Sequence, residues 1–314
     1  MEWLRAWMLP PQGSEFAKEI DFVYMGIFWL SVVLFLGIVV PMAYFAVRYR
    51  YVPGRVTPHQ THNTTLEIVW SVLPLLLCVA LFFWGLVGYL KYIVAPGEAM
   101  EIQVTAQKWQ WAFEYPDGTR SLNEVHVPVD KPVRFVMTSV DVLHDFFVPD
   151  MRVKMDIIPN RYTQIWFTPT VVGEHVSTCA EYCGKGHSDM HAKVFVDTQA
   201  DYDKWMATGG TEWETYKTNM ADWGKIQWER KGCQTCHNID GTRSKGPSWK
   251  GIFGKMEKLN NGTTVLVDEN YLRESMMQPN AKVVDGFEAI MPTFQGLLRE
   301  NELNGLIAFI KSLQ

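Results

Sequence analysis

The sequence predicts a multidomain chain with three parts of different class: a two-helix transmembrane hairpin, an all-β sandwich and an all-α C-terminal domain. Three observations support this: two long uncharged apolar stretches near the N-terminus, then segments in which apolar and polar residues alternate, then helical spacing up to the C-terminus. The 314 residues, of which 47% are hydrophobic, suffice for more than one folded core. We place the parts at residues 1–95, 96–205 and 206–314, the last including a linker.

The first part contains two candidate membrane spans. No charged residue occurs in residues 22–47, over 26 positions, or in residues 68–90, over 23 positions. About 20 apolar residues are enough for a helix to cross a bilayer. Buried helices of soluble proteins usually carry a polar stripe, and these stretches contain few polar residues. We therefore predict transmembrane helices at about 22–47 and 68–90.

Positive charge is concentrated between the two spans. The linker carries three arginines and no acid before Glu67, whereas the N-terminal tail carries more acids than bases. Cytoplasmic loops are enriched in Lys and Arg, so the linker is expected in the cytoplasm and both termini outside. We see no secretory signal before the first span.

Glu67 stands at the cytoplasmic end of the second span and has two interpretations. An acid in the first turn of a helix is stabilised by the helix dipole. A carboxylate at the edge of a membrane span is also costly to keep without a function, which makes Glu67 a candidate proton entrance. The residues alone leave both interpretations open.

Beyond residue 97 the apolar residues alternate with period two. Four segments show this most clearly: 102–106, 133–137, 163–167 and 192–196. Turn residues such as Pro116-Asp117-Gly118 separate them. The pattern predicts an antiparallel sandwich of about 100 residues.

The spacing becomes helical after Gly209-Gly210. Leu303, Leu306, Ile307 and Ile310 fall at i, i+3, i+4 and i+7, which is one face of a terminal helix. The formal net charge of −5 comes without a basic block, so no nucleic acid is expected as a partner.

A covalent haem attachment pattern, Cys-x-x-Cys-His, occurs at Cys233, Cys236 and His237. The two thiols bind the haem and the adjacent imidazole coordinates its iron. A redox-active or structural Cys-x-x-Cys with an incidental His is the alternative.

A thioether suits the second axial position of such a haem. Four methionines follow the pattern: Met256, Met276, Met277 and Met291. Met291 precedes Pro292 on a loop just before the terminal helix, and we predict it as the ligand. Met276 and Met277 lie in a helical-looking stretch, where packing is the expected role.

A second group of metal-binding residue types is Cys179, Cys183, His187 and Met190, on a glycine-containing loop between strands. His144, 35 residues before Cys179, supplies a second imidazole. Thiolate, thioether and imidazole are soft ligands suited to copper. Two bridging thiolates with a His on each side predict a dinuclear copper centre, whose weak terminal ligands are Met190 and a backbone carbonyl.

Three other interpretations compete at this loop. A disulfide between Cys179 and Cys183 explains the thiols but not the flanking ligands. A structural zinc site of two Cys and two His has no use for Met190. A mononuclear blue-copper site needs one Cys, and the loop offers two. The fifth cysteine, Cys78, lies inside the second span, where a small apolar role is expected.

Taken together, the chain resembles subunit II of the haem-copper cytochrome c oxidases fused to a C-terminal cytochrome c domain, the arrangement of the caa3-type bacterial oxidases. The resemblance covers nearly the whole chain. Besides the hairpin, the copper loop and the haem pattern, it rests on the stretches Gln107–Tyr115, Asp141–His144 and Lys154–Pro159. It implies a cupredoxin-like sandwich and a class I cytochrome c domain.

The resemblance implies roles for individual residues. The copper pair is the family's CuA centre, and the carbonyl of Glu181 is its backbone ligand. The Glu181 carboxylate reaches a magnesium or manganese ion shared with subunit I. Trp109 is the family's electron-accepting indole over the copper site, although one more aromatic residue in a sheet is the alternative. Glu67 matches the acid at the entrance of the K proton pathway. The implied CuA ligands are His144, Cys179, Glu181, Cys183, His187 and Met190.

The resemblance also implies the function. A cytochrome c or a quinol-oxidising complex reduces the haem, and the electron passes to CuA and then to subunit I, where oxygen is reduced to water with proton translocation. Subunit I, subunit III and membrane lipid are the expected partners. The expected location is the bacterial cytoplasmic (inner) membrane, with the CuA and haem domains on the outer, periplasmic face.

Two alternatives to this function stay open. One is the haem c and CuA subunit of a different haem-copper reductase, such as a nitric oxide reductase. The other is a structural subunit with a zinc-stiffened sandwich that has no redox role.

Two positions depart from the family's pattern. Asn160 replaces the usual Gly after Ile158-Pro159, but Asn tolerates a left-handed turn. Arg299 stands where the terminal helix commonly has a Ser or Thr N-cap, so we expect a shifted start with Asn301 as the cap. The remaining histidines are expected to be solvated or structural: His59, His62, His126, His175 and His191.

Overall fold

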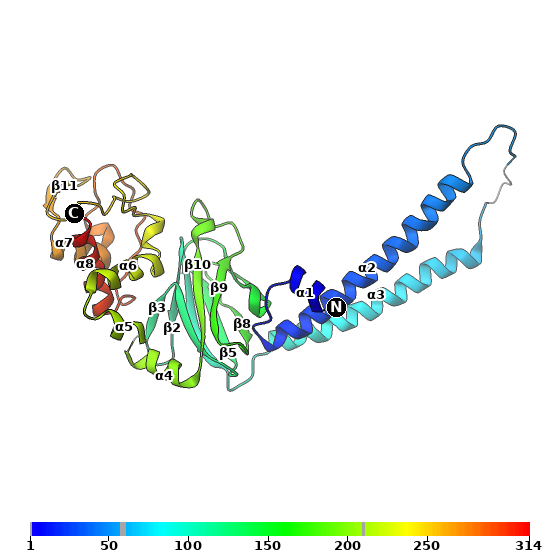
Figure 1. Ribbon diagram of the computed structural model, residues 1–314, viewed down its shortest axis with the longest axis horizontal. Coiled ribbons are helices and arrows are strands. Elements are labelled where there is room, and N and C mark those ends of the chain that lie inside the picture. Colours follow the sequence, from blue (N-terminus) through cyan, green and yellow to red (C-terminus); the bar gives the residue numbers. More distant parts are fainter. Residues whose placement is uncertain (1, 57–60, 209–210) are drawn as a thin grey trace. The chain divides into compact units, whose positions relative to one another are not determined.

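The computed structural model describes residues 2–56, 61–208 and 211–314 (Figure 1). The chain forms two compact units, one of residues 1–12 with 16–95 and one of residues 13–15 with 96–314. His59 and Gly209-Gly210 lie outside the described residues.

The first unit is a helical hairpin. The short helix α1 (Glu2–Met8) is followed by α2 (Glu15–Arg48) and α3 (Thr64–Ile93). Both α2 and α3 are long and apolar enough to cross a membrane, and their apolar windows are not buried within the protein. The 34 and 30 residues correspond to about 50 and 45 Å of helix, against about 30 Å of hydrocarbon in a bilayer. Each predicted span lies inside one of these helices.

Contacts between the first half of α2 and the end of α3 hold the two helices together. Lys91 Nζ lies 3.1 Å from a carboxylate oxygen of Glu19. A Cβ atom at Gly26 would lie 3.1 Å from the Trp84 ring, so glycine allows this indole to approach the helix backbone. The Phe22 and Trp84 rings meet edge to face at 5.8 Å.

The second unit contains a β-sandwich of two five-stranded sheets, which confirms the predicted sandwich. The strand orders are β3-β2-β1-β5-β8 and β4-β10-β9-β6-β7. The strands are β1 (Met100–Gln107), β2 (Gln110–Glu114), β3 (Arg120–Leu122), β4 (Glu124–Pro128), β5 (Val133–Ser139), β6 (His144–Val148), β7 (Val153–Ile157), β8 (Thr163–Phe167), β9 (Gly173–Cys179) and β10 (His191–Asp197).

The sandwich is mixed rather than antiparallel. Strand β1 pairs with β5 in parallel, and β10 pairs with β4 in parallel. The prediction of an antiparallel sandwich is therefore wrong at these two pairs. Alternating burial shows which face of a strand is covered. The same alternation arises whether the neighbouring strand runs parallel or antiparallel, so it does not report strand direction.

Aromatic side chains fill the core of the sandwich. Trp111, Phe113, Phe135, Phe146 and Phe167 are completely buried. The ring of Phe146 lies 5.4 Å from that of Trp111 and 5.5 Å from that of Phe135. Dense packing of these rings fixes β6, the strand that begins with a predicted metal ligand.

The C-terminal part is mostly helical, as predicted. A hydrophobic cluster that includes Trp249, Leu272 and Leu306 forms its core. The elements that follow the sandwich are α4 (Gln199–Thr208), α5 (Thr211–Tyr216), α6 (Met220–Arg230), η3 (Cys233–Thr235), β11 (Met256–Lys258), β12 (Thr264–Leu266), α7 (Glu269–Met277), η4 (Pro279–Ala281) and α8 (Glu300–Ser312). The residue 206 at which we place the linker lies within α4.

The terminal helix α8 buries the predicted face. Leu303, Leu306, Ile307 and Ile310 are all buried. A Cβ atom at Gly224 of α6 would overlap the Gly305 carbonyl of α8, so glycine at both positions lets the two helix backbones touch.

The structure describes both positions that depart from the family pattern. Asn160 has φ 60°, the left-handed conformation expected of it. The predicted Asn301 cap is wrong, because α8 begins at Glu300 with Arg299 as its N-cap. The Arg299 N–H donates to Glu302 Oε2 at 2.8 Å, so an acid three residues into the helix caps it instead.

Candidate metal centre and haem cavity

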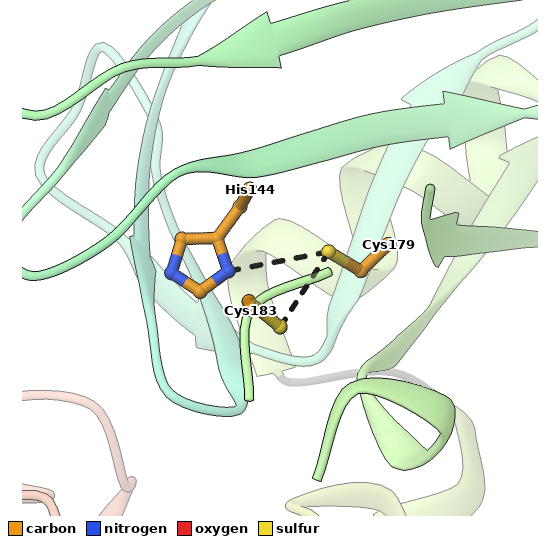
Figure 2. Close-up of side chains that lie close together, drawn as sticks. All are labelled: His144, Cys179 and Cys183. Atoms are coloured by element: carbon orange, nitrogen blue, oxygen red, sulfur yellow. Dashed lines mark hydrogen bonds between the residues drawn. The ribbon is translucent and has the colours of Figure 1, made fainter. Parts of the chain in front are cut away.

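Donor atoms of His144, Cys179 and Cys183 converge beside the sheet (Figure 2). The three atoms lie within 4.8 Å of one another, and all three residues are buried. Cys179 Sγ is 4.0 Å from His144 Nδ1 and 3.8 Å from Cys183 Sγ. His144 begins β6 and Cys179 ends β9, and the pairing of β6 with β9 brings them together across 35 residues of sequence.

Three further donors surround the same sulfurs. His187 Nδ1 lies 3.7 Å and Met190 Sδ 3.8 Å from Cys183 Sγ. The carbonyl oxygen of Glu181 is 3.2 Å from Cys179 Sγ. The turn η2 (His187–Asp189) places His187 and Met190 on the same side of the loop as the thiol. The structure thus brings together all six predicted ligands: His144, Cys179, Glu181, Cys183, His187 and Met190.

Asp141 orients the His144 ring. Its Oδ1 lies 2.9 Å from His144 Nε2, which leaves Nδ1 facing the thiols. Burial lowers the pKa of His144, although Asp141 opposes part of this shift. The neutral ring with its proton on Nε2 is the form that binds a metal through Nδ1. The sequence did not point to this role of Asp141, although its position three residues before a predicted ligand is a signal for it.

The two thiols are separate groups that fit a shared pair of metal ions. Their sulfurs are 3.8 Å apart, against about 2.05 Å in a disulfide. Burial, with the nearby Cys179 as a second cause, raises the pKa of Cys183 to about 12, so metal binding must displace a proton. Two sulfurs between two imidazoles, a thioether and a carbonyl fit two copper ions, whereas one tetrahedral zinc would use four of these donors.

A second site is a cavity in the helical part. Cys233, Cys236 and His237 all line it. Apolar walls and thiols beside an imidazole are what a covalently attached haem requires, so the lining fits that group. The apolar lining includes Trp249, Ile252, Tyr271, Leu272, Phe294 and Leu306.

Backbone contacts fix the orientation of His237. Its Nδ1 lies 2.8 Å from the carbonyl oxygen of Pro247, which leaves Nε2 for a metal. Burial lowers the pKa of His237, with the Pro247 carbonyl opposing, so the ring stays neutral at pH 7. A Cβ atom at Gly246 would lie 2.6 Å from the ring, so only glycine lets the chain pass here.

The structure separates the four methionines. Met291 lies on a loop and lines the cavity. Met276 also lines it but belongs to α7 and is buried in the helical core. Met277 packs against that core, and Met256 on β11 is exposed.

Trp109 contacts both sites. Its indole packs against Gly184 and Gly186 of the copper loop, and a Cβ atom at Gly186 would overlap the ring. The same side chain lines the haem cavity. Lys245 Nζ lies 4.7 Å above the ring and 3.7 Å from a carboxylate oxygen of Asp189. Nothing in the sequence pointed to Lys245, because its partners are distant along the chain.

Glu67 lies in the first turn of α3. This helix belongs to the first unit, whereas the residues of both sites belong to the second. Its Oε1 accepts the Asn63 N–H at 3.2 Å, and Asn63 Oδ1 accepts the Leu66 N–H at 3.1 Å. The carboxylate therefore helps to cap the helix.

The other described histidines stand apart from the copper cluster. His126 is stacked between the rings of Phe195 and Trp205, and His175 Nδ1 lies 2.8 Å from Asp150. His62 and His191 are exposed.

Comparison with known protein families matches all three parts of the chain. Residues 3–86 match the transmembrane domain of cytochrome c oxidase subunit II, and residues 119–196 match its periplasmic domain. Residues 221–314 match the cytochrome c family.

Curated relatives agree with these matches. The chain is 32% identical over 210 residues to the alternative cytochrome c oxidase subunit 2 of Bradyrhizobium diazoefficiens, covering 57% of this chain and 76% of that one. It is 29% identical over 318 residues to cytochrome c oxidase subunit 2 of Alkalihalophilus pseudofirmus, covering 98% and 90%. The periplasmic domain of subunit II from Bradyrhizobium japonicum is 30% identical and covers 37% of this chain and 96% of that one, with a TM-score of 0.36.

Proposed function

This chain belongs to the cytochrome c oxidase subunit II family and carries a C-terminal cytochrome c domain, and we propose that it is the electron-accepting subunit of its oxidase. It takes electrons at a covalently attached c-type haem and delivers them by way of a dinuclear CuA centre to subunit I, where oxygen is reduced to water with proton translocation. One observation carries this proposal: four donor atoms surround two thiols, and the tryptophan beside this six-residue cluster also lines the haem cavity.

Six residues would hold the copper ions. Cys179 and Cys183 lie centrally, His144 and His187 lie on either side, and Met190 and the Glu181 carbonyl complete the set. Copper bound there supplies one-electron redox chemistry. The chain's own contribution is rigidity: the ligands come from two paired strands and a short loop, so their positions need to change little when an electron arrives.

Four residues would hold the haem. Cys233 and Cys236 would bind it covalently, and His237 Nε2 and the Met291 thioether would ligate its iron. Met291 is preferred to Met276 because it stands on a loop, whereas Met276 is committed to the packing of α7. A thioether ligand favours a high reduction potential.

Trp109 is the proposed link between the two groups. It touches the copper loop at Gly184 and Gly186 and forms part of the haem cavity wall. Its buried Nε1 has no hydrogen-bond partner within the described part of the chain. An aromatic ring that borders both sites offers a route for electrons between them.

Two carboxylates have proposed roles at the boundary with subunit I. The Glu181 side chain is exposed while its carbonyl faces the copper cluster, which fits a magnesium or manganese ion shared between subunits. Glu67 is proposed as the entrance of the K proton pathway in addition to its capping contact.

The proposed setting follows from the family. A subunit II of a haem-copper oxidase complex has subunit I as its partner. We propose subunit III and membrane lipid as further partners. The proposed donor is a cytochrome c or a quinol-oxidising complex. The hairpin anchors the chain in a membrane with the sandwich outside, and we propose the bacterial cytoplasmic membrane with both redox domains on the periplasmic face.

Metal content tests the proposal. The full chain, expressed without subunit I and with haem attachment and copper loading, is expected to hold two coppers and one iron. One copper, or a zinc, would contradict a CuA centre and leave the haem as the only electron carrier of the chain.

A further inference from the structure

A buried cation lies between two buried acids in the second unit. The Lys231 ammonium is 2.8 Å from Glu124 and 3.0 Å from Glu302. The side chain of Lys231 is 1% exposed, and those of the acids are 8% and 9% exposed. Charges removed from water in this way are costly unless each has a close partner, so this group requires a particular arrangement of its three members.

The three charges come from two differently folded parts. Glu124 begins β4 of the sandwich, whereas Lys231 follows α6 and Glu302 lies in α8 of the helical part. Glu302 also accepts the Arg299 N–H, which fixes it within its own part. The Lys231–Glu302 pair is therefore internal to the haem domain, and the Lys231–Glu124 pair joins it to the sandwich.

Two arginines next to these charges make a second connection between the haem domain and the sandwich, through cation–π contacts. Arg299 lies 5.1 Å above the Trp205 ring, and Arg230 lies 5.9 Å from the Phe195 ring. His126 is stacked between these two rings at 4.2 and 4.4 Å. Two cations of the haem domain thus lie over two rings of an aromatic stack that belongs to the sandwich and to α4.

The connection runs directly into the haem attachment site. Gly232, with φ 72°, follows Lys231 and precedes Cys233. A Cβ atom at Gly232 would lie 2.9 Å from Nδ2 of Asn123 on the sandwich. Asn123 is itself fixed, since its Oδ1 accepts the Trp111 N–H at 2.8 Å. The position of the first haem-binding thiol is therefore set against the copper-binding sandwich.

From these contacts we propose that Lys231, Glu124 and Glu302 form a docking lock that holds the haem domain on the sandwich in one orientation. The inference deepens the proposed electron relay and rests on it for its purpose, because a fixed orientation keeps Cys233 and Trp109 in the same arrangement at every transfer. A buried ion pair adds little to affinity compared with apolar packing, but it penalises every arrangement in which one charge loses its partner.

Charge reversal at Glu124 tests the lock in the purified oxidase that contains the full chain. Glu124→Lys places a second ammonium beside Lys231 and leaves the Lys231–Glu302 pair intact. Hydrogen–deuterium exchange in residues 120–126 and 228–236 is expected to become at least tenfold faster, with unchanged exchange in residues 133–139 of the sandwich core. Glu124→Gln, which keeps the size of the side chain, is expected to give a smaller increase.

Glu174→Lys is the matched control. It makes the same change of charge on the same sandwich, at an exposed ion pair with Lys193, and is expected to leave exchange at the wild-type rate. Unchanged exchange in 228–236 for both Glu124 variants would overturn the lock.

Rapid oxidation of the haem separates the lock from the relay. In Glu124→Lys the rate of haem oxidation is expected to fall at least tenfold together with the loss of protection. Faster exchange with an unchanged oxidation rate would support the lock but contradict transfer from haem to copper.

Discussion

The sandwich and the haem domain provide different surroundings for their proposed redox groups. The sandwich fills its core with its own aromatic rings, and neighbouring donor atoms at its copper loop lie 3.2 to 4.0 Å apart. The haem domain arranges its apolar residues around a cavity, so that Tyr271 and Leu272 belong both to its core and to the cavity wall.

The two regions differ in how much their folding depends on the bound cofactor. A copper site built on a packed sandwich is preorganised, and the metal completes the ligand cluster without supplying the core. A domain whose core surrounds a cofactor gains folding free energy from that cofactor. The two regions should therefore respond differently when their redox groups are lost.

The largest expected effect is loss of the haem domain when haem attachment is blocked. In Cys233→Ser/Cys236→Ser, iron is expected to fall from one per chain to none, because no thiol remains to bind the haem. The helical circular dichroism of this domain should fall with it, while two coppers stay bound. A folded helical domain without iron would remove the contrast between the two regions.

Loss of copper should leave the sandwich folded. Cys183→Ser removes a proposed bridging thiolate on a loop outside the aromatic core, so copper should fall from two per chain to none. The free energy of unfolding of the copper-free sandwich should change by less than about 1.5 kcal/mol, measured by urea denaturation against the copper-free wild type. Unfolding of the sandwich in this variant would show that the loop is part of its core.

Acid should weaken the junction between the two regions. Burial raises the pKa of Glu124, but the charge and hydrogen bond of Lys231, together with the charges of His126 and Arg230, outweigh this and lower it from 4.5 to about 2. The contribution of this carboxylate is therefore complete above pH 4.5 and is lost as the pH falls to about 2. The total loss is about 3 kcal/mol at 1.36 kcal/mol per pKa unit.

Hydrogen exchange in residues 228–236 measures this acid effect, after correction for the intrinsic pH dependence of exchange. Glu124→Gln lacks the titrating group and is expected to show a flatter dependence between pH 4.5 and 3. Equal slopes in the two proteins would mean that Glu124 does not titrate with the junction.

A smaller effect is expected at the support of the copper site. Asp141→Asn keeps an oxygen near His144 Nε2 but removes the charge, and copper affinity should fall about 10- to 100-fold. Competition with a copper chelator measures this. His191→Ala, next to Met190 but exposed, is the control and should bind copper as the wild type does.

The sequence predicted those parts of the fold that hydrophobic patterns report directly. Two uncharged stretches predicted α2 and α3, and the spacing from Leu303 to Ile310 predicted the buried face of α8. Strand direction was missed, because the parallel pairing of β1 with β5 leaves the same alternation as an antiparallel one. The cap of α8 was missed because Glu302, and not a residue at the cap position, supplies it.

The site could be predicted as far as its residues are close in sequence. Five copper ligands lie within twelve residues, and the haem pattern is five residues long. The interdomain contacts had no such signal: Lys231 and Glu124 are 107 residues apart, and Lys245 meets Trp109 only in the folded chain. A lysine before a haem pattern is an ordinary surface residue until the fold shows its partners.

The order of electron transfer is the central claim, and haem oxidation in a copper-site variant tests it most directly. In the purified oxidase with His144→Ala, the donor should still reduce the haem at the wild-type rate, because the haem cavity is unchanged. After rapid mixing with oxygen, the haem should stay reduced, since its electron acceptor is disabled. Haem oxidation at the wild-type rate in this variant would contradict a relay through the copper site.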